Sequence, residues 1–271
     1  MSGNGKTFIK VLMAGGSILI AFVLFSFVFR APEPEEMGPT PDNAARLIKA
    51  YPAQKLRYAG NRIIFPDGYA IVYDDRKTKS FEEKLADSDI EDMFSAEYGL
   101  GERPDYLADG GRIRNERFFR KMYGASAAEV YKRLVVVDWF GEKVKFTSVN
   151  GAAERLREVA EELAANFPNL RPYLSSGGTF NWRKVRSSNG LSPHSYGIAI
   201  DIAISNSDYW KWKYPRASEM DRIDYSNRIP LELVRVFEKH GFIWGGRWYH
   251  YDTMHFEYRP EIAVTAEACS K

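Results

Sequence analysis

The sequence predicts an α+β fold: an antiparallel sheet with flanking helices, preceded by a single N-terminal transmembrane helix. Two β-hairpin patterns and four segments with helical character occur as separate blocks along the 271 residues, without the regular strand–helix alternation of a parallel sheet. A stretch without charged residues lies near the N-terminus, at residues 11–29. The chain is also long enough to bury a sizeable core.

The uncharged stretch of residues 11–29 is predicted to anchor the chain in a membrane. At about 1.5 Å per residue, its length nearly matches a hydrocarbon core of roughly 30 Å. Lys6 and Lys10 precede it, which predicts that residues 1–10 stay in the cytoplasm and that the rest lies outside. A cleaved signal peptide is the alternative, but no A-x-A-like cleavage site ends the run.

The rest of the chain divides into four predicted parts. Residues 30–43 are rich in proline, which is typical of a stiff, solvated linker. Residues 44–130 form an N-terminal region of unknown role, which we expect to pack on the next domain. Residues 131–262 form the main domain, and residues 263–271 form a tail.

Composition excludes several classes of protein. The chain has 38 basic and 36 acidic residues, and this balance argues against nucleic acid as the main partner. The chain contains a single cysteine, Cys269, so an intrachain disulfide framework is excluded.

Two segments are predicted to form β-hairpins. Residues 61–75 carry two apolar runs on either side of the turn sequence Pro66-Asp67-Gly68. Residues 133–149 carry two further strand-like runs, and we expect Gly141 and Glu142 to lie between the strands.

Four segments are predicted to be helical at least in part. Residues 79–94 are acidic. Residues 111–124 are basic and aromatic, and we expect their aromatic side chains to be buried rather than to bind nucleic acid. Residues 152–167 have apolar side chains at helical spacing. Residues 230–240 begin with Pro230, which suits a first helical turn, and are followed by Gly241, which suits a stop.

The segment LSPHSYGIAID, residues 191–201, combines a histidine with an aspartate. If residues 197–204 form a strand, the four isoleucines share one face and point to the core, while Asp201 shares the other face with two alanines. A buried carboxylate needs a hydrogen-bonded cation or a metal ion, and His194 lies in the turn before the strand. The alternative is a surface carboxylate and a histidine that caps a turn.

The segment GRWYHYDTMHFEY, residues 246–258, contains His250, Asp252, His255 and Glu257, so three of the four histidines lie in these two short segments. Periodicity does not decide which of its histidines is a ligand or which acid is a base. In a regular strand Asp252 and His255 would face opposite sides, so a bend or bulge between them is needed. Glu257 shares the face of His255 and could orient a ligand.

The two segments together predict a metal site. His194, Asp201 and one histidine of the second segment would supply three protein ligands and leave one position open, as catalytic zinc requires. Zinc lowers the pKa of a bound water molecule and polarises a carbonyl group, and a nearby carboxylate can accept the proton.

The same residues resemble a known family, the zinc D-alanyl-D-alanine carboxypeptidases and L-alanyl-D-glutamate endopeptidases, or VanY-like M15 peptidases. The later element is an acid-x-x-His motif at Asp252 and His255, and the resemblance covers residues 152–258. The S-x-H-x-x-G-x-A-x-D signature of the family is matched by Ser192, His194, Gly197, Ala199 and Asp201.

The resemblance implies roles for individual residues. His194, Asp201 and His255 would bind Zn²⁺, and Asp252 would be the general base for a metal-activated water that attacks the peptide carbonyl. Arg183 would stabilise the oxyanion, with Arg186 as the second choice. The implied fold is the α+β fold shared by these peptidases and the hedgehog signalling domain.

The resemblance also implies a substrate, the peptidoglycan stem peptides of the bacterial cell wall. We expect a D-alanyl-D-alanine carboxypeptidase whose domain lies in the periplasm, held by a single-pass anchor in the inner membrane, with Ser192, Tyr196 and Trp248 binding substrate. An endopeptidase acting on the same polymer and a non-catalytic zinc-containing peptidoglycan-binding module are the alternatives. Neither Ser-x-x-Lys nor H-E-x-x-H occurs, which disfavours serine-type and thermolysin-like peptidases.

Overall fold

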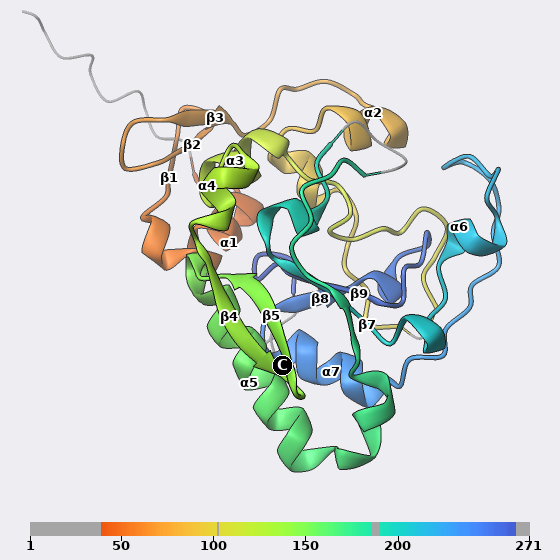
Figure 1. Cartoon of the computed structure of the whole chain (residues 1–271). Coiled ribbons are helices and arrows are strands. Elements are labelled where there is room, and N and C mark those ends of the chain that lie inside the picture. The colour runs from red at the N-terminus through yellow and green to blue at the C-terminus, as the bar shows by residue number, and fades with distance from the viewer. Residues whose placement is uncertain (1–38, 102, 186–189, 264–271) are drawn as a thin grey trace, which may run out of the picture. The chain divides into compact units, whose positions relative to one another are not determined.

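The fold of the described residues is α+β, as predicted. The computed structural model describes residues 39–263 except 102 and 186–189. Within this part all the strand pairs of the sheets are antiparallel, and helices lie beside the sheets (Figure 1). The predicted anchor at residues 11–29 lies outside the described residues, and so does the tail from residue 264 on. In the part that is described, no helix is both long and apolar enough to cross a membrane.

A four-stranded sheet in the order β6-β7-β9-β8 forms the centre of the fold. Its two inner strands pair with Asp201 directly opposite His255 and with Ala199 opposite Glu257. Side chains of paired residues lie on the same face of a sheet, so this register brings the two predicted motifs together. The strands are β6 (Ser176–Gly178), β7 (Ala199–Ile202), β8 (Phe242–Trp244) and β9 (His255–Tyr258).

Strand β7 is shorter than the predicted strand of residues 197–204. Ile198, Ile200 and Ile202 are fully buried, as predicted, but Ile204 is 45% exposed. Ala203 has a positive φ of 51°, which breaks the alternation of the strand, and Ile204 begins a short 3₁₀ helix instead. The prediction that Ile204 faces the core is therefore wrong.

Two smaller sheets confirm the predicted hairpins. The first is three-stranded, β1 (Arg57–Ala59), β2 (Arg62–Ile64) and β3 (Ala70–Val72), and the turn around Asp67 joins the last two strands. The second pairs β4 (Leu134–Trp139) with β5 (Glu142–Thr147).

The turn of the second hairpin differs from the prediction by one residue. Phe140 and Gly141 form it, both with positive φ, and Glu142 already belongs to β5. A two-residue turn in which both residues have a positive φ matches the twist of the strands that it joins. Phe140 and Gly141 are therefore sufficient to close this hairpin.

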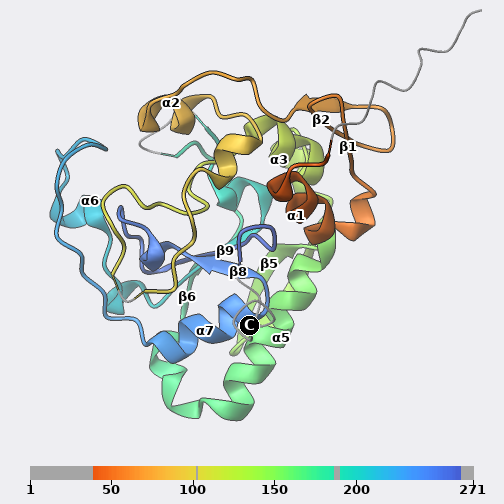
Figure 2. The same ribbon diagram turned by 180° about the vertical axis from the view of Figure 1, so that it is seen from behind.

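The helices surround the central sheet. Figures 1 and 2 show α5 and α7 side by side below it, and α7 contacts β8. The helix predicted after Pro230 is confirmed, as is the helix predicted to end at Gly124. The α-helices are α1 (Asp42–Ala50), α2 (Phe81–Ala86), α3 (Glu116–Tyr123), α4 (Ala127–Tyr131), α5 (Ala152–Asn166), α6 (Trp210–Lys213) and α7 (Leu231–Lys239).

Short 3₁₀ helices connect many of these elements. One of them, η5, carries His194. The 3₁₀ helices are η1 (Pro52–Gln54), η2 (Glu91–Phe94), η3 (Val149–Gly151), η4 (Pro168–Tyr173), η5 (Pro193–Tyr196), η6 (Ile204–Asn206) and η7 (Gly245–Arg247).

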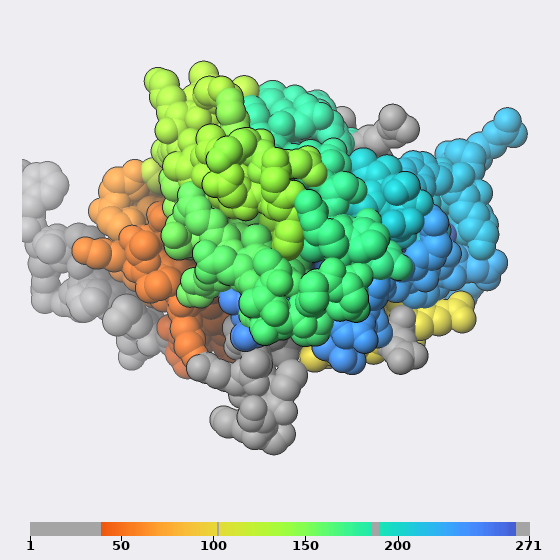
Figure 3. Space-filling view, turned by 60° about the horizontal axis from the view of Figure 1, so that its bottom comes forward, coloured from red at the N-terminus to blue at the C-terminus, as the bar shows by residue number. Residues whose placement is uncertain are grey.

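One cluster of buried apolar side chains extends from Ala44 in α1 to Tyr258 in β9. It joins side chains of the N-terminal elements, such as Leu47 and Phe118, to the stacked rings of Phe237 and Phe256, whose centroids are 4.0 Å apart. On the face shown in Figure 3, the green middle of the chain lies between the orange N-terminal residues on the left and most of the blue C-terminal residues on the right. The N-terminal elements therefore share the core of the central sheet.

A shared core predicts that damage near the N-terminus destabilises the whole unit. Leu47 is fully buried, and Leu47→Ala should lower the free energy of unfolding by about 2–5 kcal/mol in one cooperative transition. Denaturant unfolding followed by tryptophan fluorescence and by circular dichroism measures this. Leu100→Ala, at a site 44% exposed, is the control and should change stability by less than about 0.5 kcal/mol. Two separate transitions for Leu47→Ala would contradict a single core.

Candidate metal centre

A short 3₁₀ helix and a tight turn place His194. The side-chain oxygen of Ser192 accepts a hydrogen bond from the backbone N–H of His194 and so caps η5, and Pro193 occupies the first helical position. Gly197 ends η5 with a φ of 66°, and a Cβ there would lie 2.5 Å from Leu134 Cδ2. The fixed serine and glycine of the motif therefore aim the chain from His194 into β7.

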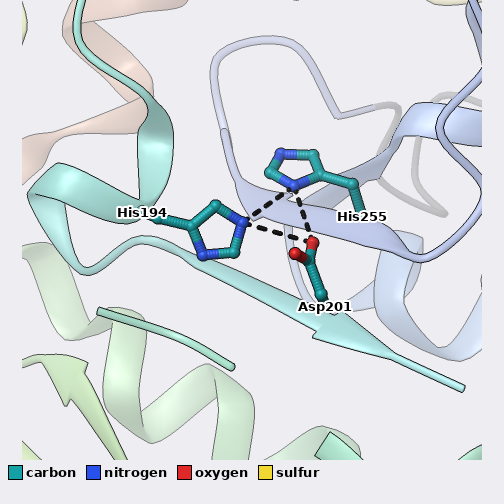
Figure 4. Close-up of side chains that lie close together, drawn as sticks. All are labelled: His194, Asp201 and His255. Carbon is teal, nitrogen blue, oxygen red and sulfur yellow. Dashed lines mark hydrogen bonds and ion pairs between the residues drawn. The ribbon is translucent and has the colours of Figure 1, made fainter. Parts of the chain in front are cut away.

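Three side chains converge where β7 and β9 pair (Figure 4). His194 Nε2 lies 3.2 Å from His255 Nδ1 and 3.2 Å from Asp201 Oδ1, and His255 Nδ1 lies 3.1 Å from the same oxygen. One atom from each residue lies within 4.8 Å of the other two. The structure therefore selects His255, rather than His250, as the partner of His194 and Asp201.

In each imidazole, the partner of the nitrogen that points away from the centre shows which nitrogen carries the proton. The other nitrogen faces the centre as an acceptor. His194 Nδ1 lies 2.5 Å from the carbonyl oxygen of Thr179, and a carbonyl oxygen only accepts, so Nδ1 carries the proton. His255 Nε2 lies 3.1 Å from the carboxylate of Glu257 and donates to it in the same way. Glu257 thus holds the ring orientation, as the shared face of the two residues suggested.

Two imidazole lone pairs and a carboxylate oxygen then face one another, and acceptors in this arrangement need a cation between them. A metal ion fits this donor set, because nitrogen and carboxylate oxygen are the ligands that zinc prefers. Without a metal, a proton takes that position. Burial lowers the pKa of His255, but hydrogen bonds to Asp201 and Glu257 outweigh this and raise it to about 10. Metal binding must displace that proton.

Asp252 lies beside the three converging residues. It stands in a turn before β9, in which the backbone N–H of His255 donates to the Asp252 carbonyl oxygen at 3.1 Å. This turn is the predicted bend that lets Asp252 and His255 serve one site. The Asp252 Oδ1 atom is buried and has no hydrogen-bond partner among the described residues. Burial, followed by the charge of Asp201, raises the pKa of Asp252 to about 7.

A cleft of about 480 Å³ opens over this centre. Of the other residues predicted to act on substrate, Arg183, Ser192 and Trp248 line it, and Arg183 is exposed. The positive charge of Arg183 acts on Asp252 and opposes the rise of its pKa. Trp248 donates its indole N–H to the carbonyl of Gly110, with its ring 5.7 Å from that of His255.

Tyr196 is not in the lining of this cleft, contrary to the expectation that it binds substrate. Its side chain is 1% exposed and packs against the rings of Phe119 and Tyr123. Its position in η5, between the two fixed motif residues, turns the ring toward α3 and the core. Arg186, the second choice for the oxyanion, lies outside the described residues.

Several lining residues were not predicted from the sequence. Arg112 and Arg114 come from the N-terminal region, and Tyr209, Trp210 and Trp212 come from the segment around α6. The basic character of residues 111–124 was visible in the sequence, but nothing there indicated that two of its arginines line the cleft. Such contacts depend on pairing between segments more than a hundred residues apart.

His250 is held away from the metal centre. Its Nδ1 lies 2.6 Å from Asp109 Oδ2, and its backbone N–H donates to the other oxygen of that carboxylate. Rings of Phe81, Trp210 and Tyr249 surround it. His250 therefore ties the N-terminal region to the segment before β9 rather than acting as a ligand.

One comparison with known proteins gave a match. Residues 186–258 match the family model described as D-alanyl-D-alanine carboxypeptidase, which confirms the resemblance to M15 peptidases. The matched segment includes His194, Asp201, Asp252 and His255. No curated protein and no solved structure was found to match the chain.

The geometry predicts that divalent zinc stabilises the folded chain through His194. At a zinc concentration 100 times its dissociation constant, the free energy of unfolding should rise by about 2.7 kcal/mol. His194→Ala should weaken zinc binding by more than about 100-fold, because it removes one of three ligands. His240→Ala is the matched control, since His240 contacts Glu158 and Glu162 instead. Calorimetric titration of both variants checks this, and equal zinc affinity in the two would contradict the assignment.

The raised pKa of Asp252 predicts that the free energy of unfolding of the metal-free protein falls as the pH rises. A carboxyl group with a raised pKa binds its proton more tightly in the folded state, so folding loses free energy as the pH rises from about 4 toward 7. After chelation, Asp252→Asn should raise stability by up to about 4 kcal/mol more at pH 8 than at pH 4. Denaturant unfolding at both pH values measures this. The exposed Asp138→Asn variant should show no such difference.

Proposed function

We propose that this chain, whose residues 186–258 are those of an M15-family peptidase, is a zinc-dependent D-alanyl-D-alanine carboxypeptidase acting on peptidoglycan stem peptides. The observation that carries the proposal is the convergence of His194, Asp201 and His255 beside the buried carboxylate of Asp252. All four residues line one cleft, which is large enough for a short peptide.

The residues of the centre would have different roles in peptide hydrolysis. His194, Asp201 and His255 would hold a zinc ion, which when bound would lower the pKa of a water molecule and polarise the scissile carbonyl. Asp252 would take one proton from the attacking water and deliver it to the nitrogen of the leaving residue. The carbon–nitrogen bond then breaks, and the products are a shortened peptide with a new carboxylate and a free amino acid.

The electrostatic setting of Asp252 suits a proton acceptor that also returns the proton. Burial and Asp201 raise the pKa of Asp252, whereas the positive charges around it oppose this rise. A pKa near the working pH lets one carboxyl group both accept and donate a proton. Arg183 at the rim of the cleft would stabilise the negative charge that develops on the carbonyl oxygen.

The proposed location follows from the sequence alone. We propose that residues 11–29 anchor the chain in the inner membrane of a bacterium and that residues 30–43 hold the catalytic domain in the periplasm. Peptidoglycan lies in that compartment, so the anchor would keep the cleft close to the substrate.

The proposal predicts that Asp252 is required for hydrolysis but not for metal binding. Incubation of the full-length, zinc-loaded chain with a synthetic stem peptide ending in D-Ala-D-Ala should release one alanine, detected by mass spectrometry and prevented by a chelator. Asp252→Asn should lower the rate by about 10²- to 10⁴-fold while zinc is retained. Asp138→Asn, an exposed aspartate in β4, should be unaffected.

Other outcomes separate the alternatives. Normal turnover by Asp252→Asn would contradict the role of Asp252 as the general base. A cut inside the stem would identify an endopeptidase that uses the same centre. A folded, zinc-loaded chain that binds stem peptides without cutting them would identify a binding module.

A further inference from the structure

Residues 109–114 are held beside the metal centre by hydrogen bonds and close packing. The carbonyl of Gly110 accepts from the indole N–H of Trp248 at 2.8 Å, and the carbonyl of Gly111 accepts from Arg259 at 2.7 Å. Gly111 has a φ of 88°, and a Cβ there would lie 2.4 Å from Ile243 Cδ1. In Figure 2 the yellow part of the chain that leads into this segment lies between α6 and β8.

These contacts place two arginines, Arg112 and Arg114, in the lining of the cleft. The two differ in how completely acidic side chains neutralise their charge. Arg112 makes two hydrogen bonds to Glu219, at 2.6 and 3.0 Å, and a third to Asp109 at 3.0 Å. Its charge is therefore neutralised inside the protein. It supports the wall of the cleft and has little capacity left for a ligand.

Arg114 has one weak polar partner among the described residues. Its Nη1 lies 3.5 Å from Glu257 Oε2, and that carboxylate already serves His255 at 3.1 Å and Arg259 at 2.9 Å. The Arg114 side chain is only 14% exposed, yet it lines the cleft. A guanidinium has five N–H donors, so Arg114 brings to a buried position a positive charge that the described residues neutralise poorly and donors that they do not fill.

The surroundings of Arg114 favour an anion. Burial lowers the pKa of Arg114, and the positive charges of Arg259 and Arg112 lower it further, against the opposing effect of Glu257. An anion bound at this place would relieve that repulsion. A planar carboxylate matches the paired N–H groups of a guanidinium better than it matches an ammonium group.

Arg114 lines the same cleft as His194, Asp201 and His255. Glu257 Oε2 lies 3.5 Å from Arg114 Nη1 and 3.1 Å from His255 Nε2, the nitrogen that faces away from the centre. The guanidinium therefore lies beyond the outer side of that imidazole. A peptide whose scissile bond lies at the centre would extend past His255 for its terminal carboxylate to reach Arg114.

We propose that Arg114 binds the C-terminal carboxylate of the substrate and makes the N-terminal region a specificity element for a peptide with a free C-terminus. This inference rests on the proposed function, because it assigns an end to the peptide that the centre cuts. Arg114 would thus act at a different place from Arg183, whose charge acts on Asp252. Residues 109–114 would decide that the enzyme acts as a carboxypeptidase.

Binding to an inactive full-length chain tests this separately from catalysis. In the zinc-loaded Asp252→Asn background, the dissociation constants of acetyl-Lys-D-Ala-D-Ala and of its C-terminal amide are measured by calorimetry. The free acid should bind about 10- to 100-fold more tightly than the amide, the value of a hydrogen-bonded charge pair. Adding Arg114→Gln should abolish this preference, because it should weaken binding of the free acid and leave binding of the amide unchanged. Lys184→Gln is the matched control, an exposed cation in the same cleft that should leave the preference intact.

The outcomes are distinguishable from failure of the proposed function. Equal binding of acid and amide without the Arg114 substitution would overturn the inference, even if the wild-type chain cuts stem peptides. A preference that survives Arg114→Gln would also overturn it. If Arg114→Gln does not fold, Arg114→Lys keeps the charge but loses the paired donors, and the preference should fall at least threefold; an unchanged preference would again reject the role. Failure of the wild-type chain to cut any stem peptide bears on the proposed function alone.

Discussion

The centre depends on one pairing between strands, the register that sets Asp201 opposite His255 across β7 and β9. A shift of one of these strands by one residue would turn its side chains to the opposite face of the sheet, and the converging acceptors would separate. The apolar face of β7 resists such a shift, because Ile200 and Ile202 are fully buried in the core. The hydrophobic core therefore helps to hold the ligands in position.

A buried chain of charges extends this constraint to the N-terminal region. Glu257 holds the imidazole of His255 and also pairs with Arg259, which in turn pairs with Glu261 at 2.5 Å. The hydroxyl of Tyr51, at the end of α1, donates to Glu261 at 2.5 Å. Buried charges are costly unless they are paired, so removing one member would leave its neighbours uncompensated. The N-terminal elements are thus coupled to the orientation of a metal ligand.

Local pattern was sufficient for most of the secondary structure. Turn residues at Asp67 and Gly124 and the helical spacing after Ala152 identified elements that the structure contains. The errors lie where tertiary packing or backbone twist overrides local pattern. Ile204 leaves the strand because Ala203 takes a left-handed conformation, and Tyr196 turns into an aromatic cluster instead of the cleft.

The sequence by itself determined the chemistry of the site, because His194, Asp201 and the acid-x-x-His element carry it in two short segments whose spacing is visible in the chain. It also indicated the bend between Asp252 and His255, since alternation along a strand would otherwise separate them. Periodicity left His250 and His255 open and the family resemblance implied His255, but only the tertiary structure gave the physical reason, because the choice depends on which histidine lies opposite β7 and which pairs with Asp109. Only the tertiary structure, too, brought Arg112 and Arg114 to the cleft, because contacts between distant segments follow from packing and leave no periodic signal in the sequence.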